Sequence, residues 1–305
     1  MKTFTKKLKI IFLHIFVLLL FFVLFFKYSE EITKLKAKIY YMMQSSHADS
    51  NIDFTEYPIM THSEHAWYDT TRLIFHAGGG IDGLDYTNSK EALEAVLEKG
   101  ESFVEIDFMY TSDHELVCMH KWGEQWGKEE APSIEEFISS KIYGKYSAMT
   151  AAELIQYMER YPNLYIIIDT KEENQIEVVE SLVALSAEHT DITERLIIQL
   201  YADGIKEKIQ QIYPFSDENF LFTAYKFGSN YPNKIMEICY DENITVVTVP
   251  YDVWDKETKE LYASKGFVVF EHTVNRPDFA MKSLEEGVHG FYTDFLSEKD
   301  FEKRN

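Results

Sequence analysis

Beyond about residue 70, short apolar runs rich in β-branched and aromatic residues alternate with longer amphipathic stretches. Strands that alternate with helices in this way indicate βα units and a parallel sheet. The amphipathic stretches include residues 89–99, 151–159 and 174–186. The apolar runs number nine and cover residues 73–75, 103–108, 116–119, 164–168, 196–200, 220–223, 244–249, 267–270 and 290–292.

Nine such runs within one domain predict an α/β fold, an eight-stranded (β/α)8 TIM barrel that carries one additional strand. Residues 103–119 are interrupted only by the four residues 111–114, which are too few for a helical crossover. This part is therefore predicted to be a hairpin-like excursion from the sheet. A doubly wound open sheet is the alternative architecture. No internal repeat, P-loop or GxGxxG motif occurs in the sequence.

The beginning of the chain has a different pattern. Residues 1–9 hold four lysines, and residues 10–26 form an apolar run that only His14 interrupts. A helix of 17 residues is about 26 Å long at roughly 1.5 Å per residue, which is enough to cross the hydrocarbon core of a bilayer. A cleaved signal peptide is the alternative. The run is long for one, and no small-x-small cleavage site follows it.

These patterns predict four segments. Residues 1–9 are a cytoplasmic basic flank, and residues 10–28 are a transmembrane signal-anchor. Residues 29–70 form a juxtamembrane helix and a linker, and residues 71–305 form the barrel domain. The basic flank stays on the cytoplasmic side of a membrane. We therefore expect a single-pass protein of the cell membrane with its barrel domain outside the cell.

Charge and cysteine content narrow the classes of partner. Residues 1–50 carry a net charge of +5, so the other 255 residues carry −26. An acidic surface of this kind repels nucleic acid and attracts divalent cations, so we expect no nucleic acid partner. The two cysteines, Cys118 and Cys239, are predicted to be buried free thiols rather than a disulfide or a zinc site.

Carboxylates at the ends of predicted strands suggest a metal site. Glu105 and Asp107 lie two residues apart, so a strand places both side chains on one face. Asp169 follows the apolar run of the next strand but one. Neighbouring carboxylates repel each other, and a hard cation such as Mg²⁺ or Ca²⁺, which prefers oxygen ligands, removes the repulsion. An exposed acidic strand face is the alternative.

Two histidines and a lysine lie at equivalent strand ends. His76 ends the run Leu-Ile-Phe-His, and His120 ends Leu-Val-Cys-Met-His. Lys171 shares a face with Asp169, either as an ion pair or as a phosphate contact. In a TIM barrel the catalytic side chains stand at the C-terminal ends of the strands. A carboxylate-bound metal with two histidines for proton transfer suits phosphoryl chemistry.

The order of these motifs resembles the glycerophosphodiester phosphodiesterase family, which is related in fold to phosphatidylinositol-specific phospholipases C. That family shows His-Arg-Gly, Glu-Asn-Thr, Glu-x-Asp, Thr-x-Asp-Gly, His-Asp, acid-x-Lys, Thr-Val-Asn and Gly-x-x-Gly-x-x-Thr-Asp. The resemblance covers about residues 73–295. The corresponding segments of this chain are His76-Ala77-Gly78, Thr87-Asn88-Ser89, Glu105-Ile106-Asp107, Thr111-Ser112-Asp113-His114, His120-Lys121, Asp169-Thr170-Lys171, Thr273-Val274-Asn275 and Gly287-Val288-His289-Gly290-Phe291-Tyr292-Thr293-Asp294.

Three positions depart from the family. Ala77 stands where the family has an arginine that helps to hold phosphate, Asp169 is shorter than the usual glutamate, and Lys121 replaces the aspartate after the second histidine. Lys171, Lys121 and Arg276 are the candidates to replace the guanidinium, although an ammonium group lacks its bidentate geometry.

The resemblance implies a metal-dependent phosphodiesterase with a phosphodiester substrate. One divalent cation, Mg²⁺ or Ca²⁺, is expected on Glu105, Asp107 and Asp169. His76 and His120 are expected to act as general acid and general base, in an order that the sequence leaves open. The alternatives are a phosphodiesterase for a surface glycan, a non-catalytic barrel that binds a phosphoglycan, and an unrelated metal-dependent amidase. Substrate contacts are expected from three further residues, namely Lys171, Asn88 and Asn275.

Overall fold

The computed structural model describes residues 57–62, 66–123, 125–224 and 232–301. The chain divides into two units, Met1–Ile52 and Asp53–Asn305, and all described residues belong to the second. The predicted basic flank, signal-anchor and juxtamembrane helix lie outside the described residues. Within the part of the chain that is described, no helix is both long and apolar enough to span a bilayer.

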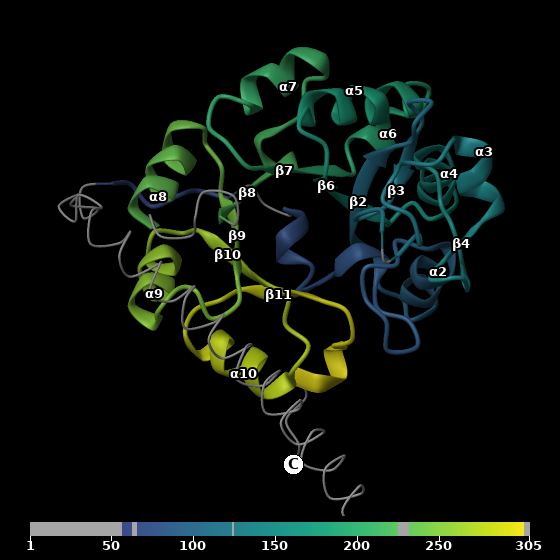
Figure 1. Cartoon of the computed structure of the whole chain (residues 1–305). Coiled ribbons are helices and arrows are strands. Elements are labelled where there is room, and N and C mark those ends of the chain that lie inside the picture. Colours follow the sequence, from purple (N-terminus) through teal and green to yellow (C-terminus); the bar gives the residue numbers. More distant parts are fainter. Residues whose placement is uncertain (1–56, 63–65, 124, 225–231, 302–305) are drawn as a thin grey trace, which may run out of the picture. The chain divides into compact units, whose positions relative to one another are not determined.

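Eight parallel strands close into a barrel (Figure 1). Each strand pairs with the next one around the ring, and β1 pairs with both β2 and β11, so the barrel has no free edge. The predicted TIM barrel is confirmed, and the closing pairs exclude the open sheet. In order around the ring the strands are β1 (Leu73–Phe75), β2 (Phe103–Tyr110), β6 (Tyr165–Thr170), β7 (Leu196–Leu200), β8 (Phe220–Thr223), β9 (Val246–Pro250), β10 (Val268–His272) and β11 (Gly290–Thr293).

The additional strand is β3 (Leu116–Cys118), which pairs antiparallel with the end of β2. The predicted hairpin-like excursion is thereby confirmed. A separate two-stranded hairpin of β4 (Lys141–Ile142) and β5 (Tyr146–Ser147) was not predicted. Cys118 and Cys239 are both buried and free, as expected.

The helices surround the barrel, and side-chain caps mark where several of them begin. Ser89 accepts a hydrogen bond from the N–H of Ala92, and Thr150 and Glu153 form a reciprocal capping box. The helices are α2 (Lys90–Glu98), α3 (Ile134–Ser139), α4 (Ala151–Arg160), α5 (Gln175–Leu185), α6 (Thr190–Thr193), α7 (Lys206–Ile212), α8 (Pro232–Asp241), α9 (Lys256–Ser264) and α10 (Pro277–Glu285). Short 3-10 turns are η2 (Trp67–Asp69), η3 (His76–Gly78), η4 (Asp217–Asn219) and η6 (Glu298–Phe301).

The turn η2 closes the end of the barrel at which the strands begin. Trp67 stacks on Phe103 and Phe270, with ring centroids 5.8 and 5.9 Å apart, and its indole N–H donates to the carbonyl of Glu218 at 2.8 Å. Figure 1 shows this short helix, in dark blue, within the ring of strands. Residues 67–69 thus pack into the barrel although they precede the predicted start of the domain at residue 71. A short apolar plug of this kind gives no periodic signal in the sequence.

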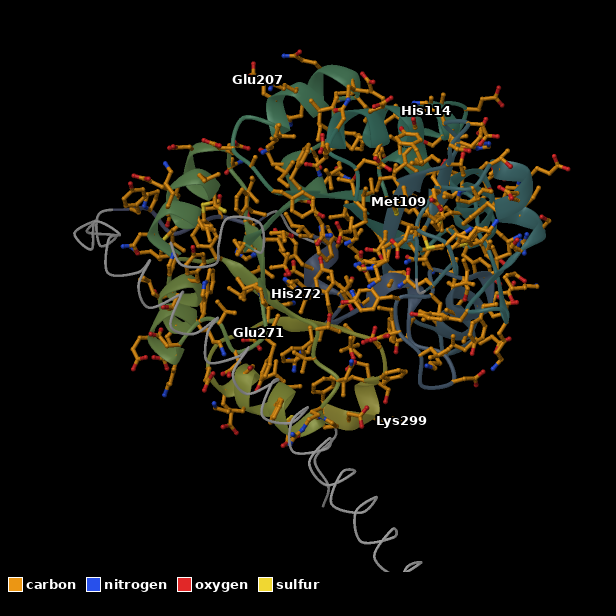
Figure 2. All side chains as sticks on the ribbon, viewed as in Figure 1. Met109, His114, Glu207, Glu271, His272 and Lys299 are labelled. Carbon is orange, nitrogen blue, oxygen red and sulfur yellow. The ribbon has the colours of Figure 1, made fainter. Side chains whose placement is uncertain are left out.

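Strand alternation separates the barrel interior from the helix layer. On β10, Glu271 is fully buried and pairs with Lys259 of α9, with Nζ and Oε1 2.8 Å apart. The next residue, His272, faces the interior of the barrel. Figure 2 shows His272 nearer the centre of the ring and Glu271 nearer its rim. Side chains at the C-terminal ends of the strands therefore converge on one space.

Candidate active site

Three carboxylates meet at the C-terminal end of the barrel. Asp107 on β2 pairs in register with Asp169 on β6, because the two strands are parallel neighbours. Glu105 precedes Asp107 by two residues and thus points to the same side. One oxygen from each of the three lies within 4.8 Å of the others. The structure brings together the three predicted metal ligands.

Glu105 is buried and only half satisfied. Its Oε2 accepts the backbone N–H of Ala77 at 2.7 Å, while its Oε1 has no hydrogen-bond partner among the described residues. Burial and the repulsion by Asp107 raise the pKa of Glu105 well above its usual value. A buried carboxylate oxygen without a partner costs free energy, and a cation at that position would remove the cost.

Asp107 is held from two sides. Its Oδ2 accepts the side-chain amide of Asn88 at 2.7 Å, and its backbone N–H donates to Asn88 Oδ1 at 3.0 Å. Burial opposes ionisation of Asp107, but the charges of Lys171 and His120 outweigh it and lower its pKa. The surroundings thus raise the pKa of Glu105 and lower the pKa of Asp107, although both residues lie on one strand.

Lys171 bridges the other two acids. Its Nζ lies 2.8 Å from Asp107 Oδ1 and 2.5 Å from Asp169 Oδ2. Burial favours the neutral amine, but the surrounding carboxylates raise the pKa of Lys171 above its usual value, so it is an ammonium group. Asp169 also accepts a hydrogen bond from the hydroxyl of Tyr201. With all three carboxylates ionised, as binding of a metal requires, the acids and the ammonium carry a net charge of about −2, which one divalent cation balances.

His76 is fixed by a carboxylate. Its Nδ1 lies 2.9 Å from Oδ1 of Asp294, which follows β11. Burial opposes protonation of His76, but the bond to Asp294 and the charge of Glu105 outweigh it and raise its pKa to about 9. With Nδ1 occupied, Nε2 is the ring nitrogen left for chemistry in the pocket.

His120 differs from His76 in its environment. It follows β3, it is partly buried, and its Nδ1 has no hydrogen-bond partner among the described residues. Burial lowers the pKa of His120, against the opposing charge of Asp107. The two histidines therefore carry different proton affinities in the metal-free protein.

The two predicted substrate-binding asparagines stand behind the carboxylates. Asn88 contacts Asp107, as described above. Asn275 Nδ2 donates to Asp294 Oδ2 at 2.6 Å, and its Oδ1 accepts the backbone N–H of Asp294 at 2.8 Å. Neither asparagine lines the pocket. Their contacts are those of residues that orient a carboxylate, and a direct contact of either with substrate stays a prediction.

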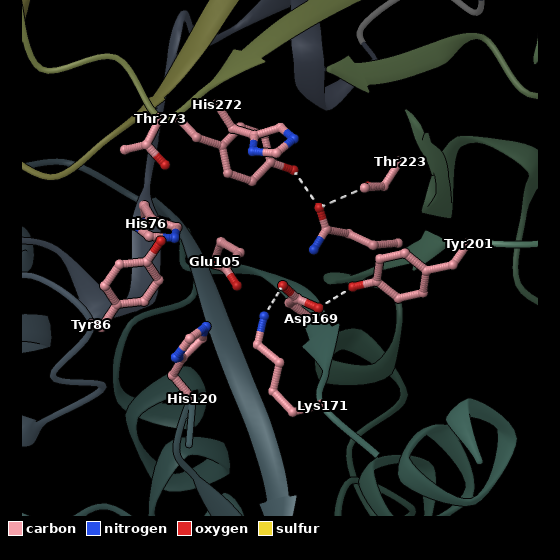
Figure 3. Close-up of a pocket in the computed structure, with 12 residues that line it drawn as sticks. His76, Tyr86, Glu105, His120, Asp169, Lys171, Tyr201, Thr223, His272 and Thr273 are labelled. Carbon is pink, nitrogen blue, oxygen red and sulfur yellow. Dashed lines mark hydrogen bonds and ion pairs between the residues drawn. The ribbon is translucent and has the colours of Figure 1, made fainter. Parts of the chain in front are cut away.

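A pocket of about 290 Å³ opens above this cluster. Figure 3 shows His76, Tyr86 and His120 on one side of it and Lys171, Asp169 and Tyr201 on the other. The lining residues are His76, Tyr86, Glu105, His120, Asp169, Lys171, Gln199, Tyr201, Thr223, His272, Thr273 and Tyr292.

Sequence reasoning missed seven of these residues. Gln199, Thr223 and His272 lie in the last two positions of their strands, so the rule that found His76 and His120 also applied to them. Gln199 Oε1 accepts hydrogen bonds from Thr223 Oγ1 at 3.2 Å and from the hydroxyl of Tyr292 at 3.0 Å. The two tyrosines that come from loops gave no comparable signal.

The three positions considered as substitutes for the missing arginine lie in different places. Lys171 lines the pocket, as described. Lys121 is exposed and does not line it. Arg276 is also exposed, and its guanidinium pairs with Asp278 at 2.5 Å and stacks on Phe279. Among the described pocket residues there is thus one lysine and no arginine.

Searches by sequence and by structure gave different results. No protein-family model matches the chain, and no curated protein sequence matches it. Solved structures do match. A phosphodiesterase from Oleispira antarctica, in complex with the product sn-glycerol-3-phosphate, is 16% identical with a TM-score of 0.61, and the alignment covers 76% of this chain and 96% of that one.

Two further structures match over similar lengths. The glycerophosphodiester phosphodiesterase of Thermotoga maritima is 18% identical with a TM-score of 0.56, over 76% of this chain and 96% of that one. That of Parabacteroides distasonis is 20% identical with a TM-score of 0.56, over 75% and 94%. At these identities the likeness establishes the fold. The chain thus has the barrel fold of the glycerophosphodiester phosphodiesterases, and the resemblance seen in its sequence is confirmed at that level.

Proposed function

We propose that this chain is a metal-dependent phosphoric diester hydrolase that cleaves a glycerophosphodiester-like substrate. The observation that supports it most strongly is the group of three carboxylates at the strand ends. One of their oxygens is buried without a partner, and two histidines and a lysine border the same pocket. The fold shared with known glycerophosphodiester phosphodiesterases makes this chemistry the most economical explanation of the site.

Glu105, Asp107 and Asp169 would hold one divalent cation, Mg²⁺ or Ca²⁺. An all-oxygen donor set suits such hard cations, and the net charge of the cluster supports a single divalent ion. When bound, the ion supplies Lewis-acid polarisation of a phosphoryl oxygen. Lys171 supplies a fixed positive charge beside it, which favours a phosphate anion in the pocket.

His76 and His120 would move the protons. Asp294 holds the His76 ring through Nδ1 and stabilises its charged form, so Nε2 gives or takes the proton. His120 lies on the same side of the pocket and completes the acid–base pair. The nucleophile is water or a neighbouring hydroxyl of the substrate, and the second choice yields a cyclic phosphate.

A panel of phosphodiesters tests this function. The full chain in detergent is assayed with Mg²⁺, Ca²⁺ or Mn²⁺, and with EDTA, on glycerophosphodiesters and on bis-nitrophenyl phosphate. Hydrolysis that requires a divalent ion supports the proposal. Hydrolysis of amides alone, or binding without turnover of any diester, would place the protein in a different class.

A phosphodiester in a surface glycan is the second candidate substrate. Gln199, Thr223 and Tyr292 form a polar, uncharged wall of the pocket, which suits a hydroxyl-rich group on one side of the phosphate. The predicted signal-anchor would hold the barrel on the outer face of the cell membrane, near such polymers. Release of phosphorylated repeat units from purified wall glycan, with glycerophosphodiesters left intact, would favour this substrate.

A further inference from the structure

Tyr86 stands between the two histidines. Its ring centroid lies 4.5 Å from that of His76, edge to face, and 4.4 Å from that of His120. It lines the pocket, on the side opposite Lys171 and Tyr201 (Figure 3). Nothing in the pattern of the sequence marks this loop residue as functional.

The hydroxyl of Tyr86 is available to a ligand. It has no hydrogen-bond partner among the described residues, whereas the other tyrosines of the pocket are engaged. Tyr201 donates to Asp169, and Tyr292 donates to Gln199. Burial and the charges of nearby carboxylates, Asp107 foremost, raise the pKa of Tyr86 to about 12. The phenol therefore keeps its proton at physiological pH and is a donor.

The chain holds Tyr86 in this position. Its backbone is in the left-handed region, with φ of 54°, a conformation that side chains other than glycine adopt only at some cost. Two residues later, the N–H of Asn88 donates to the carbonyl of Ala77 at 2.9 Å, and the Asn88 side chain is bound to Asp107. Ser89 then caps α2. The loop is thus fastened directly beyond Tyr86, so the ring is held against the histidines.

A phosphodiester presents two unesterified oxygens that share one negative charge. Lys171 is the pocket's only lysine among the described residues, and it is already engaged by Asp107 and Asp169. Ala77 provides no charge where the similar family has an arginine. On the side of the pocket that carries the histidines, the Tyr86 hydroxyl is a neutral donor within the pocket lining for the second oxygen.

We propose that the Tyr86 hydroxyl donates a hydrogen bond to an unesterified oxygen of the bound phosphodiester, on the side away from Lys171. This assignment rests on the proposed function. It makes Tyr86 a substrate-binding residue that does in part, as a neutral donor, what an arginine does in the family that the sequence resembles. Inorganic phosphate also presents unesterified oxygens, so its binding tests the Tyr86 contact without turnover.

Two variants separate the hydroxyl from the ring. Tyr86→Phe removes only the donor, whereas Tyr86→Leu also removes the contacts with both histidines. Tyr240→Phe is the control, because its hydroxyl donates to the carbonyl of Pro58, far from the pocket. The full chain is titrated with inorganic phosphate in the presence of Mg²⁺ by calorimetry. The KM and kcat for a phosphodiester are measured on the same proteins.

A hydrogen bond to a charged group contributes on the order of 1.5–3 kcal/mol, which corresponds to about 10- to 100-fold in affinity. Tyr86→Phe should therefore weaken phosphate binding and raise KM by at least about tenfold, while the pH optimum and the metal affinity stay as in the wild type. Tyr86→Leu should also shift the pH profile, because the histidines lose their neighbour. Tyr240→Phe should match the wild type.

The opposing outcomes are distinct. Unchanged phosphate affinity in Tyr86→Phe overturns the assignment, even if KM for the diester rises, because the hydroxyl would then contact the alcohol. A wild type that binds phosphate through Tyr86 but hydrolyses no diester overturns the proposed function and leaves the phosphate contact standing. If the wild type and Tyr86→Phe hydrolyse diesters at equal rates and with equal KM, the proposed Tyr86 contact alone is overturned.

Discussion

Replacing Glu105 with glutamine is expected to change the stability of the metal-free and the metal-loaded protein in opposite directions. In the metal-free protein the Glu105 carboxyl group is buried and faces Asp107, and its Oε1 has no hydrogen-bond partner among the described residues. Glutamine keeps an acceptor for the Ala77 N–H and places an amide donor toward the other carboxylates. Removing an unsatisfied buried group is worth roughly 1–3 kcal/mol. The melting temperature of the metal-free variant should rise by about 2–4 °C for each kcal/mol.

The metal-loaded protein should respond in the other way. A divalent cation at about 100 times its Kd stabilises the wild type by about 2.7 kcal/mol, a rise of roughly 5–10 °C. Glu105→Gln removes one of three ligands and lowers the charge of the cluster from about −2 to about −1. If the affinity falls about 100-fold, the same ion concentration contributes only about 0.4 kcal/mol. The rise in melting temperature caused by the metal should therefore nearly vanish in Glu105→Gln.

The pH dependence provides a second signature of the same residue. The folded-state pKa of Glu105 is raised above its unfolded value of about 4.3. Its contribution to stability is therefore fully present below that pH and is lost as the pH rises through the folded-state pKa. The metal-free wild type should lose stability relative to Glu105→Gln across this window. With saturating metal the difference should reverse in sign.

Calorimetric melting with EDTA, Mg²⁺ or Ca²⁺ measures these effects. Glu271→Gln is a matched control, because Glu271 is also a buried carboxylate of a barrel strand but pairs with Lys259 on the helix side. It should lower stability and leave the metal-induced shift intact. A wild-type metal shift in Glu105→Gln would remove Glu105 from the ligand set. A less stable metal-free variant would refute the electrostatic reasoning.

Three further outcomes are expected. His76→Ala and His120→Ala should each lower kcat by about 10²–10⁴-fold, while metal binding is retained. A substrate with a nitrophenolate leaving group should rescue only the variant that lacks the general acid. Equal rescue of both variants would refute the acid–base pairing. In NMR titrations the His76 pKa, about 9 without metal, should fall when Mg²⁺ neutralises Glu105 and Asp107, and an unchanged value would show that no ion binds there. Protease added to intact cells should digest the barrel domain. Full protection of the domain would contradict the proposed topology, and a soluble product that starts after about residue 30 would show cleavage of the anchor.

The barrel could be predicted because its strands are buried on both faces. Such strands appear as continuous apolar runs, and all nine runs coincide with strands to within a few residues. The plug at Trp67 could not be predicted, since its burial depends on a hole that only the closed barrel creates. The β4–β5 hairpin is also too short to produce a period.

The candidate site divides in a similar way. Glu105, Asp107 and Asp169 were found because a polar residue at the end of an apolar strand is conspicuous. The direction of Asn88 and Asn275 was not predictable, because loop geometry decides whether an amide faces a ligand or a carboxylate. The position of Tyr86 was not predictable either. It depends on a left-handed backbone conformation, which cannot be inferred from the residue type.

The departures from the similar family are distributed unevenly over the site. Asp169 is shorter than a glutamate, yet its register beside Asp107 keeps its oxygens within the carboxylate cluster, where Tyr201 and Lys171 hold it. The three carboxylates thus stay together on this side of the pocket despite the substitution. On the opposite side an alanine stands in place of a guanidinium, and a phenol lies between the histidines. A change confined to that side alters how tightly, and in which orientation, a phosphodiester is held, while the groups proposed to bind metal and move protons stay in place. Differences from glycerophosphodiester phosphodiesterases should therefore be sought in KM and substrate preference rather than in metal dependence or in the pH profile of kcat.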